Sequence, residues 1–169
     1  LIFQDDFRLN FIASHSNRDL PAAYKFSVWW GGQEGSLLFW LWILSTYALV
    51  AIYTNRRKHR DLMPYVIAIL MTIQAFFLLL VVIPASPFQV LAAGGEITAV
   101  PDGRGLNPLL QYPMMRIHPP MLYLGYVGFS VPFAFAVASL ITRQKGDAWI
   151  HTTRIWTMVT WLFQTCGVV

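Results

Sequence analysis

The sequence predicts an all-α fold, a polytopic membrane helical bundle of four transmembrane helices, the fourth truncated, with two longer outer-side loops. Of its 169 residues, 56% are hydrophobic and 12% are charged, whereas a soluble domain carries about 25% charged residues. Four apolar segments approach or exceed the roughly 20 residues that span a bilayer. The basic residues collect between these segments, which indicates membrane topology rather than a nucleic-acid-binding face.

Apolar spans and polar connectors alternate along the chain. In order, we predict an outer-side segment with a possible strand and interfacial helix at 1–35, a transmembrane helix at 36–54, a basic cytoplasmic loop at 55–61, a transmembrane helix at 62–83, an outer-side loop at 84–119, a transmembrane helix at 120–142, a cytoplasmic loop at 143–153 and a truncated transmembrane helix at 154–169. Because the chain opens with Leu1 and stops at Val169 inside an apolar run, we expect a piece of a longer protein. Its single cysteine, Cys166, excludes an intrachain disulfide and a CxxC pair.

The outer-side segment carries two local signals. Arg8–Asn17 alternates the apolar residues Leu9, Phe11 and Ala13, which is a weak strand pattern. Leu20–Trp30 predicts a short interfacial helix with aromatic anchors.

The first three predicted spans contain no charged residue, which disfavours a transporter or an ion pathway. Pro64 falls in the first turn of the second span, where a missing N–H costs little. Pro132 falls midway along the third span and predicts a kink. Gly125 and Gly128 in the same span are typical of close helix packing.

Basic connectors predict the orientation. The stretch NRRKHRD, Asn55–Asp61, holds four Lys/Arg residues, and Arg143, Lys145 and Arg154 flank the start of the fourth span. The positive-inside rule places both connectors on the cytoplasmic side. The segment 1–35 and the loop 84–119 are then on the outer side.

In the second outer loop, Asn107 followed by Pro108 predicts a helix start, because Asn caps and proline has its φ preset. Apolar residues follow in Leu109–Ile117. They predict a patch that lies on the membrane surface or against a partner.

Three of the four histidines have ordinary surroundings in the sequence. His59 in the basic turn is expected to be solvated, His151 at the start of the fourth span to be interfacial, and His15 between two serines to lie at the surface.

His118 differs because Pro119 and Pro120 follow it. Proline disfavours helix in the residue before it, so His118 should be extended, and Pro120 should open the third span. An imidazole held at a helix start beside aromatic and Met side chains suits axial ligation of heme iron. The same features also describe a helix-start histidine wetted by lipid headgroups.

The stretch WWGGQEGSLLFW places an acid between glycines just before the first span. Glu34 there is favoured by the dipole of the helix that follows. The functional alternative is a hydrogen-bond acceptor or a partner for an arginine such as Arg104 or Arg116. Trp29 and Trp30 fit an outer aromatic belt, and a cofactor-facing surface is the alternative.

Three stretches, WGGQEGSLLFW, DGRGLNPLLQ and HPPMLYLGYVGFSVPFAFA, occur in this order along the chain. Together they resemble the heme lyase subunit family of cytochrome c maturation, the CcmF type, and its nitrite-reductase-associated relatives. The resemblance runs from about Phe11 to Val169. It implies a multi-pass protein of the bacterial cytoplasmic (inner) membrane, with heme-handling loops on the outer, periplasmic side.

The resemblance also implies site residues. His118 matches the family histidine that is one of two outer ligands to heme iron, so it is the expected metal ligand, followed by Pro119 and Pro120. Trp29, Trp30 and Glu34 are expected to complete the cofactor-binding set, and no catalytic residue is assigned. The cofactor is b-type heme that is being delivered, and its ligands other than His118 lie outside this chain.

The chain departs from the family pattern in one respect. The family's tryptophan-rich WWD segment is absent, and by family order it follows the span that ends at Val169, with the second outer histidine later still. We therefore expect this piece alone to bind heme weakly or not at all and to be inactive by itself.

The implied function is part of a membrane heme lyase that delivers heme to apocytochrome c, where the heme vinyl groups are joined to the thiols of a CxxCH motif. The alternative is a non-catalytic membrane scaffold that docks a heme chaperone and other maturation proteins. Expected partners are that chaperone, apocytochrome c, other cytochrome c maturation membrane subunits and the lipid bilayer, and no nucleic acid.

Overall fold

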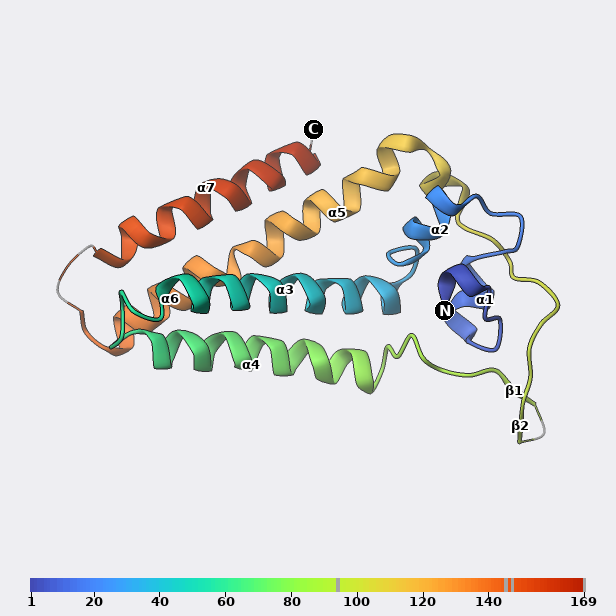
Figure 1. Cartoon of the computed structure of the whole chain (residues 1–169), viewed down its shortest axis with the longest axis horizontal. Coiled ribbons are helices and arrows are strands. Elements are labelled where there is room, and N and C mark those ends of the chain that lie inside the picture. Colours follow the sequence, from blue (N-terminus) through green and yellow to red (C-terminus); the bar gives the residue numbers. More distant parts are fainter. Residues whose placement is uncertain (94, 145, 147, 169) are drawn as a thin grey trace. The chain divides into compact units, whose positions relative to one another are not determined.

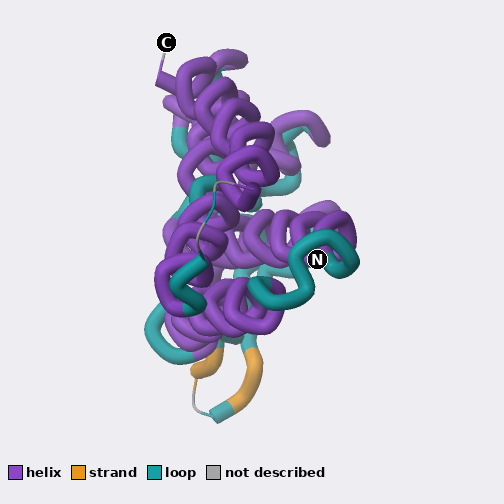
Figure 2. The backbone as a smooth tube through the Cα atoms, turned by 90° about the vertical axis from the view of Figure 1, so that its left-hand side faces the viewer, coloured by secondary structure: helices purple, strands orange, loops and turns teal. Residues whose placement is uncertain are grey.

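The computed structural model describes residues 1–93, 95–144, 146 and 148–168. Most described residues are helical, which confirms the predicted all-α fold, and the described strands form one short hairpin (Figure 2). Lys145 and Val169, which belong to the predicted second cytoplasmic loop and to the truncated span, lie outside the described residues. The chain divides into two compact units, Leu1–Phe39 with Leu78–Ile117, and Trp40–Phe77 with His118–Val169.

The first unit is built from short elements around a small core. They are the 3₁₀ helix η1 (Ile2–Gln4), α1 (Asn10–His15), α2 (Ala22–Val28), the start of α3 (Gln33–Asn55), the antiparallel pair β1 (Ala92–Ala93) and β2 (Glu96–Ile97), and the 3₁₀ helix η2 (Pro108–Gln111). Phe7, Phe11, Ile12, Val28 and Leu106 are among the buried residues of this core.

The predicted strand in Arg8–Asn17 is wrong, because this stretch forms α1. Phe11, Ile12 and Ala13 are all buried, whereas an alternating strand would point Ile12 away from its neighbours. Burial of three consecutive residues therefore outweighs the weak alternation. Only Leu9 keeps a strand-like contact, an isolated bridge to Val90.

Two other local predictions in this unit are confirmed. The helix expected within Leu20–Trp30 is α2. Asn107 caps η2, since its side-chain oxygen accepts the Leu109 N–H at 3.0 Å and Pro108 is the first helical residue. Asn at the cap and proline next are the residues that local physics favours there.

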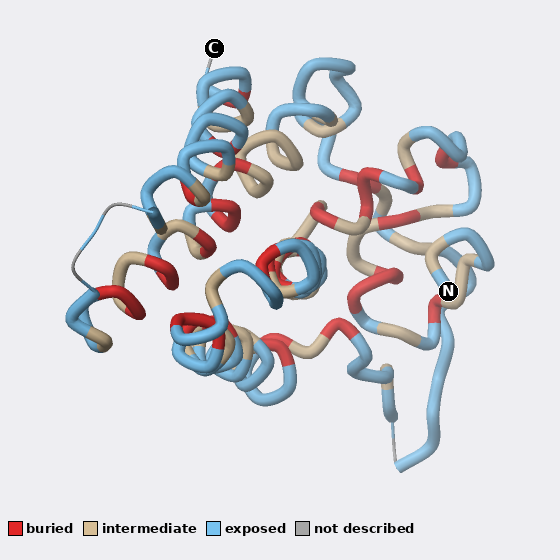
Figure 3. The backbone as a smooth tube through the Cα atoms, turned by 60° about the vertical axis from the view of Figure 1, so that its left-hand side comes forward, coloured by how far each residue is buried: buried red, intermediate tan, exposed pale blue. Residues whose placement is uncertain are grey.

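The second unit consists of long helices. It holds most of α3, most of α4 (Met63–Val82), most of α5 (Pro113–Gly128), α6 (Ser130–Ile141) and α7 (Ala148–Val168). Small residues of α3, such as Ala48 and Ala51, pack with Val66 and Leu70 of α4 and Phe135 of α6. These parts of α3 and α4 run side by side (Figure 1). Buried and exposed stretches alternate along the helices (Figure 3), and α3, α4 and α6 each contribute buried residues to the core.

Three helical stretches are long and apolar enough to cross a membrane: Gln33–Asn55, Met63–Val82 and Pro113–Ile141. They correspond to the first three predicted spans, and Pro64 lies in the first turn of α4 as predicted. The helix α7 is continuous over 21 residues but is not among these three, so the fourth span stays a prediction.

The prediction that His118 is extended and that the third span opens at Pro120 is wrong. The helix α5 begins at Pro113 and continues through both prolines. Proline disfavours helix in the preceding residue without forbidding it, and Pro113 is well suited to a first helical position. The carbonyls of residues 115 and 116 lose their helical donors, but this turn is largely exposed, where water can replace such donors.

The kink predicted at Pro132 is present one turn earlier, as a break between α5 and α6 at Phe129. Proline lacks the N–H that would bond the carbonyl four residues before it, which here belongs to Gly128. Ser130 stabilises the break by donating its hydroxyl to the Val127 carbonyl at 2.6 Å. The break therefore lies next to Gly128, whose carbonyl has no N–H donor at Pro132.

Candidate functional site

The glycines of the WGGQEG motif make room for α1 in the first unit. A Cβ at Gly32 would lie 2.6 Å from Nε2 of His15, and a Cβ at Gly35 would overlap the Trp29 carbonyl and the Phe11 ring. Ordinary contacts between carbon atoms are about 3.5–4.0 Å. Glycine is therefore required where the turn between α2 and α3 packs against α1.

Trp29 and Trp30 lie at this turn and pack on the same ring. The Phe39 centroid is 4.9 Å from Trp29 and 5.5 Å from Trp30, and Phe26 meets the Trp30 ring edge-on at 5.1 Å. Trp30 is only 6% exposed, and its buried indole N–H has no hydrogen-bond partner among the described residues. Trp30 is thus committed to packing, while the half-buried Trp29 keeps an accessible surface.

That surface of Trp29 borders a cavity of about 310 Å³ within the first unit. Its walls are apolar and include Phe11, Ile12, Leu38 and Phe88. The volume lies at the lower end of the range for small-molecule pockets, about 300–1,000 Å³. Of the predicted site residues, Trp29 is the one that lines it.

Glu34 is the second residue of α3 and is partly exposed. The ion pairs among the described residues are Arg8–Asp6 and Lys25–Asp5, so the pairing of Glu34 with Arg104 or Arg116 is not found there. Instead, the Arg116 guanidinium lies 4.7 Å from the centroid of the Tyr24 ring. The placement of Glu34 agrees with stabilisation by the dipole of α3.

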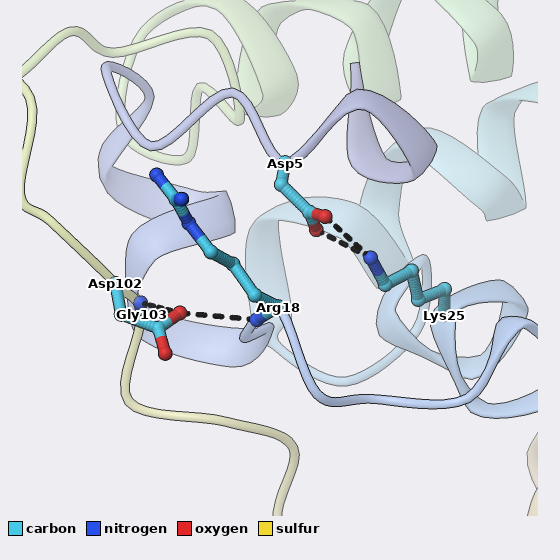
Figure 4. Close-up of polar contacts among 5 residues, drawn as sticks. All are labelled: Asp5, Arg18, Lys25, Asp102 and Gly103. Atoms are coloured by element: carbon cyan, nitrogen blue, oxygen red, sulfur yellow. Dashed lines mark hydrogen bonds and ion pairs between the residues drawn. The ribbon is translucent and has the colours of Figure 1, made fainter.

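The DGRG stretch docks the long loop onto α1. The Arg104 and Gly105 N–H groups donate to the Ala13 and Ser16 carbonyls at 2.8 and 3.1 Å. The Asp102 carboxylate accepts the Arg18 and Gly103 N–H groups at 3.0 and 2.8 Å (Figure 4). These bonds satisfy carbonyls at the end of α1 that have no partner within the helix.

Two ion pairs brace the first unit. Lys25, 8% exposed, donates to both oxygens of Asp5 at 2.6 Å (Figure 4), which joins α2 to the turn after η1. On the surface, Arg8 donates to both oxygens of Asp6 at 2.7 and 2.8 Å. This hydrogen bonding holds the pKa of the Asp6 carboxyl below its ordinary value.

His118 lies on the exposed side of α5, followed by the half-buried Pro119 and Pro120. Within the described part of the chain, its imidazole has no hydrogen-bond partner. Met114 and Met115 precede it by four and three residues and therefore share its helix face. Both are well exposed, at 68% and 43%. The helix thus presents one nitrogen ligand and two thioether side chains together.

Two other histidines are less exposed than expected. Nδ1 of the half-buried His15 lies 2.9 Å from the Phe11 carbonyl, and because a carbonyl only accepts, Nδ1 carries the proton. His59, predicted to be solvated, is half-buried, with Nε2 2.7 Å from the Thr152 hydroxyl of α7. Nothing in the local sequence signals this contact, since the two residues are 93 positions apart. His151 is exposed, as expected for an interfacial residue.

The predicted site residues divide between the two units. Trp29, Trp30 and Glu34 belong to the first unit, and His118, with its two prolines, belongs to the second. Among the described residues, no group of three or more His, Cys, Asp or Glu side chains is placed to hold a bare metal ion. Axial ligation of heme needs fewer protein ligands, since the porphyrin supplies the rest.

Comparison with known proteins identifies relatives of the chain. The family model described as cytochrome C assembly protein matches residues 30–169. The cytochrome c-type biogenesis protein CcmF of Escherichia coli K12 is 40% identical over 165 residues, and that of Pseudomonas aeruginosa is 42% identical over 166 residues. The cytochrome c-type biogenesis protein NrfE of Haemophilus influenzae is 40% identical over 166 residues.

Each of these alignments covers 98% of this chain but 25% of the relative. The chain therefore spans about a quarter of the length of the curated relatives it matches. No solved structure matches the chain.

Proposed function

Since this chain belongs to the cytochrome C assembly protein family, we propose that it is part of a membrane heme lyase. This lyase holds heme at the outer face of the cytoplasmic membrane and delivers it for covalent attachment to apocytochrome c. The expected partners are a heme chaperone, apocytochrome c with its CxxCH motif and other maturation subunits of the membrane. The names of the relatives place them in cytochrome c biogenesis.

The observation that carries the proposal is the setting of His118. Its imidazole is exposed and unpartnered among the described residues, on a helix continuous with a candidate membrane span. Imidazole is a common axial ligand of heme iron, and exposed Met side chains on the same face suit an apolar, polarisable macrocycle. We assign His118 as one axial ligand to the heme that is delivered.

Covalent attachment of heme requires mainly that the protein position the heme and the thiol. A cysteine S–H adds across a heme vinyl C=C: a carbon–sulfur bond forms at one vinyl carbon, and the hydrogen ends on the other. No net electron is transferred, so the protein contributes by holding the heme plane while a thiol reaches the vinyl group. His118 restrains the iron, and the rigid turn with Pro119 and Pro120 restrains His118.

The remaining predicted residues take supporting roles in this proposal. Trp29 offers an apolar surface next to the cavity of about 310 Å³. Trp30 positions Trp29, because both rings pack on Phe39. Glu34 places a carboxylate at the start of α3, available to a donor group.

The test uses the full-length protein with His118→Ala, and His151→Ala as a histidine control on another helix. Loss of His118 should remove outer-bound heme that copurifies with the protein and should lower maturation of a reporter cytochrome c, while the control keeps both. Added imidazole should restore the heme absorption spectrum of His118→Ala, because it replaces the missing ligand. Wild-type heme content and maturation in His118→Ala would refute the assignment.

A specific observation also supports the scaffold alternative. Leu109, Tyr112, Met114, Met115 and Ile117 are all exposed, from 43% to 69%, and such a patch is typical of an interaction surface. If the patch docks the chaperone, charged substitutions there should abolish chaperone crosslinking even when heme is absent. His118→Ala would then leave that crosslinking unchanged.

A further inference from the structure

A second cavity, of about 460 Å³, lies within the second unit where the end of α3 faces the start of α7. Its polar lining includes Lys58, His151, Thr54 and Thr152, and its apolar lining includes Ile155 and Trp156. A smaller cavity of about 260 Å³ shares Thr54 and Lys58 with it. Lys58 therefore contributes to the walls of both.

The surroundings of this cavity are strongly basic. Within the described residues, Arg57, Lys58 and Arg60 form no ion pair, and Asp61 is the only acidic residue of the turn 55–61. Arg56 is already engaged, because its guanidinium lies 3.8 Å from the centroid of the Tyr53 ring and donates to the Tyr53 carbonyl at 3.0 Å. Lys58 is thus an available cation at the cavity wall.

The hydroxyl groups in the wall are occupied. Thr54 donates to the Val50 carbonyl at 2.7 Å, and Thr152 contacts His59 at 2.7 Å. An anion in this cavity would therefore depend on charge from Lys58 more than on hydroxyl donors. Three rotatable N–H donors suit the Lys58 ammonium to a phosphate group.

The cavity has a charged residue, Lys58, at one end and apolar side chains along its walls. Val50 lies on α3, eight residues before Lys58, which belongs to the turn after the helix ends at Asn55. Ile155 lies one turn after His151 on α7. Val50 and Ile155 both line the cavity and are 43% and 64% exposed. A charged end followed by exposed apolar walls matches a phosphate group with an attached acyl chain, and inorganic phosphate would leave the apolar walls unused. The helix α3 is a candidate membrane span, so this end of it lies at headgroup level.

We propose that this cavity binds an anionic phospholipid, with the phosphate at Lys58 and an acyl chain along Val50 and Ile155. Basic pockets between transmembrane helices are typical sites for such headgroups, and each Lys or Arg near the surface contributes about 1 kcal/mol. The proposal does not depend on heme binding at His118.

The test is native mass spectrometry of the full-length protein with phosphatidylglycerol, cardiolipin and phosphatidylcholine as probes. Lys58→Gln should weaken binding of both anionic lipids about fivefold, as expected from the loss of one such charge, and should leave phosphatidylcholine unchanged. Lys58→Arg should retain binding, which shows that the variant effect is one of charge. The matched control is Arg60→Gln, which removes the same charge from the same turn but does not line this cavity.

Three outcomes would overturn the proposal. They are unchanged lipid binding in Lys58→Gln, an equal loss in Arg60→Gln, and equal competition by inorganic phosphate and by anionic lipid. The second outcome would mean a diffuse surface attraction, and the third a site for free phosphate. Since His118 is not altered, heme content should stay at the wild-type level in every variant.

Discussion

Close contact between α5 and α7 makes Gly128→Ala a sharp test of the packing. A Cβ at position 128 would overlap Cγ2 of Thr160 and lie 3.0 Å from its Cβ and 3.1 Å from Cε2 of Tyr47. Thr160 is fully buried, and its hydroxyl donates to the Trp156 carbonyl at 2.9 Å. Its side chain therefore cannot move away without losing this hydrogen bond and its packing. Ordinary contact distances of about 3.5–4.0 Å are then reached only if α7 moves away.

The expected magnitude follows from two opposing effects. Overpacking costs about 1–3 kcal/mol, and a clash with a fixed buried side chain belongs near the upper end. Alanine in place of glycine in a helix recovers about 1 kcal/mol. We therefore expect Gly128→Ala to lower the stability of α5–α7 packing by about 2 kcal/mol.

The assay is a double-mutant cycle on thermal unfolding of the full-length protein in detergent. Thr160→Ser alone should cost about 1 kcal/mol for a lost methyl group. Because it removes the clashing Cγ2, the double variant Gly128→Ala with Thr160→Ser should be more stable than the sum of the single effects predicts, by about 2 kcal/mol. Additive effects, or a Gly128→Ala variant as stable as wild type, would refute the packing argument.

The first unit offers three more tests in the full-length protein. Asp5→Asn should destabilise the unit by about 2 kcal/mol, which is below the usual cost of breaking a buried ion pair because Asp5 is partly exposed. The double variant Asp5→Asn with Lys25→Met should recover most of the lost stability, measured as slower hydrogen exchange in the first unit. Equal exchange rates in the single and double variants would contradict a stabilising role of the pair. Gly103→Ala should make the loop 84–112 more sensitive to protease, because a Cβ there would overlap the end of α1; wild-type sensitivity would argue against docking. Arg8 lowers the folded-state pKa of Asp6. The stability that this ion pair contributes is therefore present above the unfolded-state pKa of about 3.9 and is lost as the pH falls through the lower folded-state pKa. Asp6→Asn should remove this contribution to acid unfolding, and an unchanged acid-unfolding profile would count against the role of the pair.

The sequence predicted the long helices well because their signal is local. An uncharged run long enough to span a bilayer has few alternatives, so α3 and α4 differ from the predicted 36–54 and 62–83 by at most three residues at either end. The cap at Asn107 was equally predictable, since it depends on two adjacent residues. Gly125 and Gly128 were correctly assigned to close packing, although the sequence did not say against which residues.

Where the prediction failed, the deciding contacts are distant in sequence. The helix α1 forms because Ile12 is buried among residues of other elements, and alternation alone cannot detect that. His59 was expected in water because the bond to Thr152 depends on how α7 packs. For His118, a following proline disfavours helix without forbidding it, and α5 continues through both prolines in an exposed turn where water can replace the two lost donors.

Docking of Gly103 to α1 also changes what the loop 84–112 can tolerate. Because residues 89–91 already bond Arg8 and Asn10 through their backbones, the attachment after Asp102 leaves shorter loops in place of one long connection. Closing a short loop costs less entropy than closing a long one. A Cβ added at Gly95, next to the β1–β2 hairpin, would meet nothing within 4 Å. A peptide tag inserted beside Gly95 therefore leaves the docked residues in place, which gives a route to label the protein from one side of the membrane and to read its orientation directly.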